Sequence, residues 1–265
     1  MRKFLVVFAA AALISVPALA QTTARPKSDP TNWTGFYAGL NAGGGIGSSN
    51  AQTSTVVSTS APSLNPSAVL QFNSAGNQNL SPTGYAGGLQ FGYNRQIANK
   101  WVLGAEADYG AFVTNDSATV TTILTCCAPD TFTVVQKVST DWMSTVRLRA
   151  GHTLTRRSLL FVSGGVAETQ LHYSSLLTEV EDAINESASP SVLKTGWIVG
   201  GGGEFALNKR WSARAEYLYA DFGSISNEGT VLYSGTLDVY VPANPFSHTA
   251  TLTSNIARLA VNYRF

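Results

Sequence analysis

The chain has 265 residues, with 17 Lys and Arg against 16 Asp and Glu, so no basic excess exists to attract nucleic acid. Charged residues make up 12% of the chain, about half the roughly 25% usual in soluble domains. After residue 20 no uninterrupted apolar run approaches the roughly 20 residues that a membrane-spanning helix needs. Because only helices and closed barrels satisfy every backbone group inside a bilayer, this composition favours a lipid-facing chain built from strands.

The first 20 residues have the three parts of an export signal. Arg2 and Lys3 are basic, residues 4–14 are apolar, and residues 17–20 supply a small-x-small cleavage pattern. We therefore predict a signal peptide over residues 1–20, a periplasmic segment over residues 21–32, and a barrel domain over residues 33–265.

Eight segments alternate between apolar and small or polar residues, which is the pattern of a strand with two different faces. In chain order they are residues 35–47, 85–94, 101–112, 142–150, 159–173, 195–207, 211–219 and 254–265. Most are near the 9–11 residues that a tilted membrane-spanning strand needs, or longer. The predicted fold is an all-β, eight-stranded antiparallel transmembrane β-barrel.

The links between these segments alternate in length. Three are short, at residues 96–100, 153–158 and 208–210, and four are long, at residues 48–82, 113–140, 174–193 and 224–253. Short periplasmic turns and long external loops are typical of outer-membrane barrels, which would place both termini in the periplasm. We expect the third and fourth strands to continue above the membrane as a hairpin, a similar pairing of residues 230–241 with residues 249–253, and a flexible first loop.

The polar face of the predicted strands carries charges of both signs. Glu106 and Asp108 would face Arg147 and Arg149 on the neighbouring strand, Glu204 would meet Arg214, and Glu216 would meet Arg258. An eight-stranded barrel is barely wide enough for its own side chains, so these charges must pair or be hydrated. We expect a polar core of paired charges; the alternative is a narrow ion path lined by both signs.

Aromatic residues fall near both ends of the predicted strands. Trp101 and Trp211 lie near the short-turn ends, and Trp142 and Trp197 lie towards the long-loop ends. Two girdles of amphipathic rings at the headgroup regions of a bilayer explain this placement.

Catalytic and metal-binding motifs are weak. The glycines at residues 200–203 lie within a strand and lack the Gly-Lys-Ser/Thr ending of a phosphate loop. A lipid-modifying barrel enzyme would need a serine and an acid beside His152, His172 or His248. Cys126 and Cys127 are adjacent and have no nearby histidine, so their redox state stays open and no metal site or cofactor is expected.

Three motifs resemble a known family. They are residues 33–39 (WTGFYAG), residues 215–223 (AEYLYADFG) and the chain end from Arg258 to Phe265. These resemble the small outer-membrane surface antigens of alphaproteobacteria, a porin-like family of opacity-type eight-stranded barrels. The resemblance implies an exposed, often abundant outer-membrane protein, with Tyr263 and Phe265 in the signal that the barrel-assembly machinery reads. Some relatives are described as porins and others as haem binders or adhesins.

The function expected from these features is a non-enzymatic, structural and surface-interaction role in the outer membrane of a Gram-negative cell. The alternatives are a small-solute porin with a narrow charged lumen and a lipid-modifying barrel enzyme. The expected partners are outer-membrane lipids including lipopolysaccharide, the barrel-assembly machinery and an unknown external ligand at the loops, with no nucleic acid.

Overall fold

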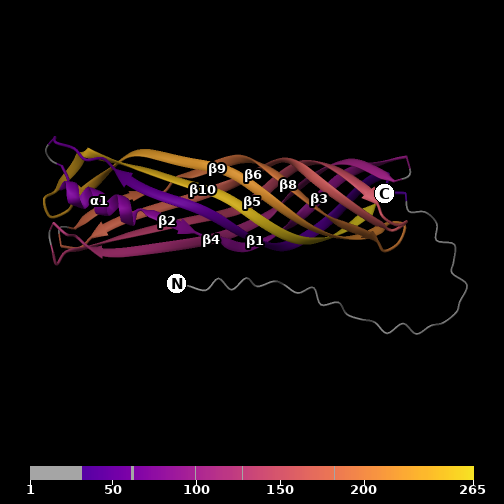
Figure 1. Ribbon diagram of the computed structural model, residues 1–265, viewed down its shortest axis with the longest axis horizontal. Coiled ribbons are helices and arrows are strands. Elements are labelled where there is room, and N and C mark those ends of the chain that lie inside the picture. The colour runs from indigo at the N-terminus through magenta and orange to yellow at the C-terminus, as the bar shows by residue number, and fades with distance from the viewer. Residues whose placement is uncertain (1–31, 61–62, 99, 127, 182) are drawn as a thin grey trace, which may run out of the picture.

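The computed structural model describes residues 32–60, 63–98, 100–126, 128–181 and 183–265. The predicted signal peptide and nearly all of the predicted periplasmic segment lie outside these residues. The described chain forms one antiparallel sheet of ten strands and one helix, drawn out along a long axis (Figure 1). Within the described ranges, no helix is long and apolar enough to cross a membrane.

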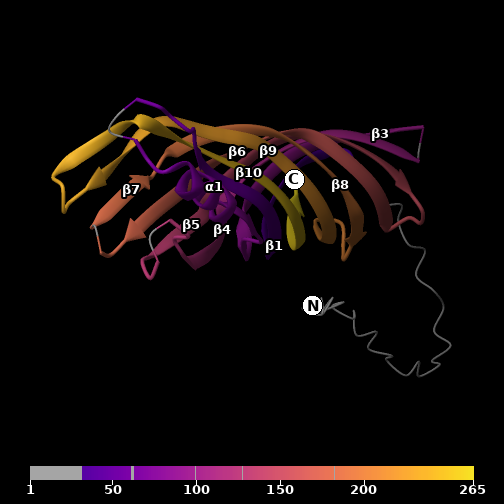
Figure 2. The same cartoon turned by 60° about the vertical axis from the view of Figure 1, so that its left-hand side comes forward.

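The long strands pair in a ring. In ring order they are β1 (Gly35–Thr55), β3 (Thr83–Ile97), β4 (Trp101–Ile123), β5 (Thr131–Thr153), β6 (Ser158–Glu179), β8 (Ser191–Ala206), β9 (Trp211–Ser234) and β10 (Val239–Arg264). Each pairs antiparallel with the next, and β10 pairs back to β1, from Tyr37 opposite Arg264 to Thr55 opposite Phe246. In the turned view of Figure 2 these strands follow one another as a twisted wall.

The sheet has ten strands where the sequence predicted eight. The two further strands are short: β2 (Asn77–Leu80) pairs with β1, and β7 (Ile184–Ala188) pairs with β6 and β9. Both lie in segments predicted as long loops. They were missed because strands of 4 and 5 residues give too few alternations to stand out from a polar loop.

The predicted long loops are mostly strand. The expected hairpin above the third and fourth strands is confirmed: Asn115 pairs with Ser139, and the pairing continues to Ile123 opposite Thr131. The strands β9 and β10 continue in the same way, although Thr249 pairs with Ser226 rather than within residues 230–241. The strand predicted to end at Tyr173 continues to Glu179. Serine and threonine on the outward face of residues 174–179 made this last extension resemble a loop.

The described part of the first predicted loop holds α1 (Pro66–Ala75). Asn65 caps this helix by accepting a hydrogen bond from the Ser67 amide at 3.0 Å, and Pro66 occupies the first helical position, where a missing amide hydrogen costs nothing. Ala68, Val69, Phe72 and Ala75 form its buried face. The helix lies at the end of the ring opposite the C-terminus (Figure 1). We call these the helix end and the short-turn end.

The outward face of the ring changes character along each strand. On β1 the outward residues from Phe36 to Ile46 are apolar or glycine, and those from Ser48 to Ser54 are polar. On β4 the apolar residues run from Trp101 to Val113, and Asn115, Ser117, Thr119 and Thr121 follow. The apolar residues make a continuous band around the half of the ring nearer the short-turn end.

The interior of the ring is filled by layers. Nearest the short-turn end, Trp33 packs with Val102, Leu159 and Ala206. A layer of charged side chains comes next. Beyond it lie two apolar clusters, one around Phe112, Leu171 and Ile256 and one in which α1 contributes Phe72 against Phe132 and Phe246. At the helix end, α1 therefore packs into the interior of the ring.

Candidate functional site

The candidate site is the layer of eight charged side chains inside the ring, which we call the charged layer. It consists of Glu106, Asp108, Arg147, Arg149, Glu204, Arg214, Glu216 and Arg258. Each lies at an inward position of its strand, as the alternation predicts, and each is at least nine-tenths buried. Buried charges at this density require partners, since an isolated ion in a low-dielectric interior is strongly unfavourable.

Arg147 is the hub of the charged layer. Its Nη2 lies 2.6 Å from Glu106 and 2.8 Å from Asp108, both on the neighbouring strand β4. Its Nη1 lies 3.2 Å from Glu216 on β9. One guanidinium therefore joins three carboxylates from two parts of the ring.

The other three arginines extend this network. Arg258 contacts Glu216 at 2.6 Å and Asp108 at 3.0 Å. Arg149 lies 3.0 Å from Glu204, and Arg214 bridges Glu204 at 3.3 Å and Glu106. Four cations and four carboxylates thus form one connected set.

The predicted neighbours lie together, and the network adds contacts that the sequence did not suggest. Register alone places Glu106 opposite Arg147, Glu204 opposite Arg214, and Glu216 opposite Arg258. The contacts of Glu106 with Arg214 and of Arg149 with Glu204 join strands that are not adjacent. Such contacts depend on the width of the ring, which an alternating pattern does not contain.

Neutral side chains complete the charged layer and were also missed. The Tyr37 hydroxyl donates to Glu106 and accepts from Arg149 at 3.2 Å, while Ser212 donates to Glu204 at 2.6 Å. Tyr37 reaches this place because it lies over Gly92, where an added Cβ would come within 2.5 Å of its ring. The inward phase of the strands was the signal that would have found these residues.

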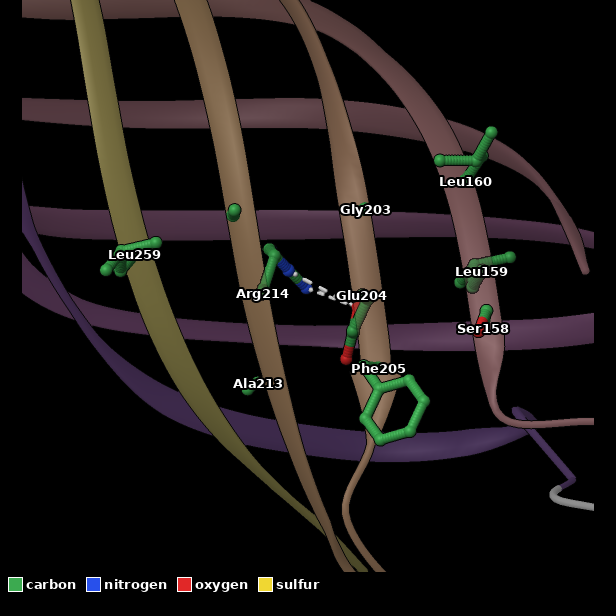
Figure 3. Close-up of a pocket in the computed structure, with 10 residues that line it drawn as sticks. Ser158, Leu159, Leu160, Gly203, Glu204, Phe205, Ala213, Arg214 and Leu259 are labelled. Atoms are coloured by element: carbon green, nitrogen blue, oxygen red, sulfur yellow. Dashed lines mark hydrogen bonds and ion pairs between the residues drawn. The ribbon is translucent and has the colours of Figure 1, made fainter. Parts of the chain in front are cut away.

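A single β-sheet separates the charged layer from the outside of the ring. Figure 3 shows Glu204 and Arg214 joined by a dashed line, beside a shallow hollow whose lining includes Leu160, Phe205 and Leu259. These three side chains are exposed and lie at outward positions of their strands. Neighbouring residues on one strand therefore serve a charged interior and an apolar exterior.

Aromatic rings lie at both edges of the apolar band. At the short-turn end Trp211 contacts Tyr263, and Tyr263 contacts Phe265, with ring centroids 5.1 and 5.3 Å apart. Trp101 is exposed on the same edge and packs against His152. At the other edge Trp142 contacts Tyr109, and Trp197 contacts Tyr219.

The height of the band fits a bilayer. Trp101 and Tyr109, at its two edges, are eight residues apart on β4. At a rise of 3.4 Å per residue that is about 27 Å along the strand. With the usual tilt of transmembrane strands it is about 21 Å along the axis of the ring, and the aromatic side chains extend it towards the roughly 25 Å of outer-membrane barrels.

The other two histidines have different surroundings. His248 is fully buried among the residues of the helix end, where its Nε2 lies 3.0 Å from Glu186 and its Nδ1 lies 3.0 Å from the Thr53 hydroxyl. Burial in the same region raises the pKa of the Tyr173 hydroxyl. His172 is half exposed on the outward face of β6, with its Nε2 2.8 Å from Asp141 and its Nδ1 2.9 Å from the Ser191 hydroxyl.

Over the described ranges, no group of three or more His, Cys, Asp or Glu residues is placed to hold a metal ion. Cys127 lies outside those ranges, so the adjacent cysteine pair is not described.

A ring of antiparallel strands with an apolar outer face and a charged inner face has the arrangement of an outer-membrane β-barrel. The sequence model of the outer membrane protein beta-barrel domain family matches residues 6–265. The 31 kDa outer-membrane immunogenic proteins of Brucella melitensis and Brucella suis are each 32% identical over 202 residues, which cover 76% of this chain and 75% of theirs.

Solved structures of outer-membrane proteins also align with the chain. OprG from Pseudomonas aeruginosa aligns over 89% of this chain and 99% of its own, with 12% identity and a TM-score of 0.42. The attachment invasion locus protein Ail of Yersinia pestis aligns over 85% and 98%, with 13% identity and a TM-score of 0.34.

The chain belongs to the outer-membrane β-barrel family, and its location is the outer membrane. The match to the family model and the similarity to the Brucella immunogenic proteins confirm the predicted resemblance to small outer-membrane surface antigens.

Proposed function

We propose that this protein is a non-enzymatic structural and surface-interaction protein of the outer membrane. In this proposal the ring of long strands is an eight-stranded transmembrane barrel, with both termini in the periplasm and the helix end outside the cell. The single observation that carries it is the filled interior: the four arginines and four carboxylates of the charged layer pair with one another, and two apolar clusters and α1 lie beyond them.

The orientation rests on the shape of the two ends. The three short turns lie at one end, together with the C-terminus, while the long hairpins and α1 extend from the other (Figure 1). Short turns on the periplasmic side are the rule in this architecture. The outer-membrane lipids, including lipopolysaccharide, would then surround the apolar band, and an external ligand would meet the helix end.

Labelling of single cysteines in whole cells tests the orientation and the surface exposure. Both native cysteines are first changed to serine, and one new cysteine is then introduced at a time. Ser117→Cys places it on the part of β4 that extends beyond the apolar band, and Thr155→Cys places it in a short turn. An impermeant maleimide should label Ser117→Cys in intact cells and Thr155→Cys only after the outer membrane is opened. The reverse pattern would overturn the orientation.

A porin function is the first alternative, because the charged layer carries both signs. It requires a continuous water path, and both Arg147 and Phe112 are almost completely buried where that path would run. Conductance of the pure protein in a planar bilayer separates the two functions.

Hydrolysis of lipid esters is a second candidate function, favoured by one specific observation. Asp141, His172 and Ser191 form a hydrogen-bonded acid–histidine–serine chain on the outward face. Asp141 is adjacent in sequence to the girdle residue Trp142, on the side of the helix end. A serine activated by a histidine is the usual nucleophile for such esters. Fatty-acid release from phospholipid or lipopolysaccharide that Ser191→Ala abolishes and Ser174→Ala leaves intact would establish it; no release supports the non-enzymatic role.

A further inference from the structure

The three short turns share one composition. Taken with the adjoining strand ends (residues 95–100, 153–158 and 207–210), each carries two basic residues and one exposed aliphatic residue, and none contains an Asp or Glu. The basic residues are Arg95, Lys100, Arg156, Arg157, Lys209 and Arg210, and the aliphatic ones are Ile97, Leu154 and Leu207. All nine are exposed.

Backbone hydrogen bonds tie these turns into one rim. The Lys100 carbonyl accepts from the Thr153 amide at 2.8 Å, and the Arg157 carbonyl accepts from the Ala206 amide at 2.8 Å. The Arg210 carbonyl accepts from the Arg264 amide at 2.7 Å. One basic residue in each turn is thus fixed to the next strand of the ring, so the positive charges form a defined edge.

The rim is next to the aromatic girdle at the short-turn end, on the side away from the apolar band. Lys100 immediately precedes Trp101, Arg210 immediately precedes Trp211, and the Arg210 guanidinium donates to the Tyr263 hydroxyl at 3.2 Å. Aromatic girdles mark the headgroup level of a bilayer, and basic side chains next to them reach the phosphates with their charged ends.

The opposite end has the opposite charge. Among the described residues outside the charged layer, ten acidic residues lie at the level of Trp142 and Trp197 or nearer the helix end, against two lysines, Lys137 and Lys194. Apart from the arginines of the charged layer, most basic side chains of the described residues therefore lie on the short-turn rim. General solubility does not explain this separation, since it would be served by mixed charge at both ends.

We propose that the short-turn rim binds the phosphate groups of anionic phospholipids in the membrane leaflet that it touches. Guanidinium groups bind phosphate oxygens through paired hydrogen bonds, and each basic side chain near an anionic surface adds attraction. Ile97, Leu154 and Leu207 hold the turns against the acyl chains, which favours a lipid over a soluble or cell-wall partner. That this leaflet is the inner leaflet of the outer membrane rests on the proposed orientation.

The test compares two charge-matched double variants in vesicles. Lys100→Gln/Arg157→Gln removes two charges from the rim, and Lys137→Gln/Lys194→Gln removes two from the other end. Each protein is refolded in vesicles that contain equimolar phosphatidylcholine and phosphatidylglycerol. Spin-labelled forms of both lipids report which lipid is enriched in the layer that directly contacts the protein. Folding is verified beforehand by the heat-dependent gel shift that closed barrels show.

The wild type and the Lys137/Lys194 variant should prefer phosphatidylglycerol, and the Lys100/Arg157 variant should lose about fivefold of that preference. No preference in the wild type, or an equal loss in both variants, would overturn the proposal. Retention of the wild type by isolated cell-wall sacculi, lost in the rim variant without any lipid preference, would assign the rim to a cell-wall partner instead. Since both leaflets of these vesicles contain the same lipids, the result is independent of the orientation that the cysteine labelling tests.

Discussion

The two halves of the barrel use the same strands in opposite ways. In the half nearer the short-turn end, which carries the apolar band and which we call the banded half, the outward residues are apolar and the interior holds eight charged side chains. In the half that carries α1, the outward residues of β1 and β4 are polar, and the interior holds two apolar clusters beside buried polar side chains such as His248 and Glu186. A single strand such as β4 passes from one arrangement to the other near Phe112. The solvent outside each half explains the inversion: lipid selects apolar residues for one outer face and water selects polar residues for the other.

The largest expected effect is on the charged layer. Arg147→Ala would leave three buried carboxylates without their shared cation and lower the free energy of unfolding by about 3–5 kcal/mol. Urea unfolding in detergent micelles, followed by tryptophan fluorescence, measures it. Lys137→Ala, an exposed lysine on the same strand, is the control. An unchanged unfolding midpoint for Arg147→Ala would mean that water already solvates these charges.

The apolar interior of the other half should be nearly as sensitive. Leu171 is completely buried, so Leu171→Ala would cost about 2–5 kcal/mol through lost burial and the cavity left behind. Leu176 lies on the outward face of the same strand, and Leu176→Ala should stay within about 0.5 kcal/mol of the wild type. Equal effects in the same unfolding assay would refute the layered interior.

The boundary of the band can be measured with an added charge. Leu89 lies in the middle of the band, and Leu89→Arg should destabilise the protein in lipid vesicles by about 2–4 kcal/mol. The outward residue Gln52 lies beyond the band, so Gln52→Arg should change little. Similar costs at both positions would show that the apolar band does not mark the lipid boundary.

The smallest effect on stability is expected at the chain end. The Phe265 side chain is 76% exposed and contacts Tyr263 on the outward face, so Phe265→Ala should change the free energy of unfolding by only about 0.5 kcal/mol. If Phe265 is read by the barrel-assembly machinery, the same variant should accumulate poorly in the outer membrane of cells while refolding normally in vitro. Normal accumulation would remove that role from Phe265.

The sequence predicted the banded half better than the other half. Alternation with a lipid-facing side identified all the long strands and the inward position of residues such as Glu106 and Arg147. It gave β1 and β6 less than their full length, because Gln52 and Ser174 look like loop residues once lipid no longer selects the outer face. The contacts of Glu106 with Arg214 and of His172 with Ser191 also lay beyond its reach, since they depend on ring width and on the side-chain rotamers of neighbouring strands.

The central claim is that the interior is sealed by its own side chains, and conductance of the pure refolded protein in a planar bilayer tests it most directly. We expect no steady conductance steps from the wild type over the voltage range in which the bilayer is stable, because the charged layer and the two apolar clusters follow one another along the interior of the ring. Reproducible unitary steps whose size changes in Arg147→Gln would contradict the claim and identify the charged layer as the lining of a pore.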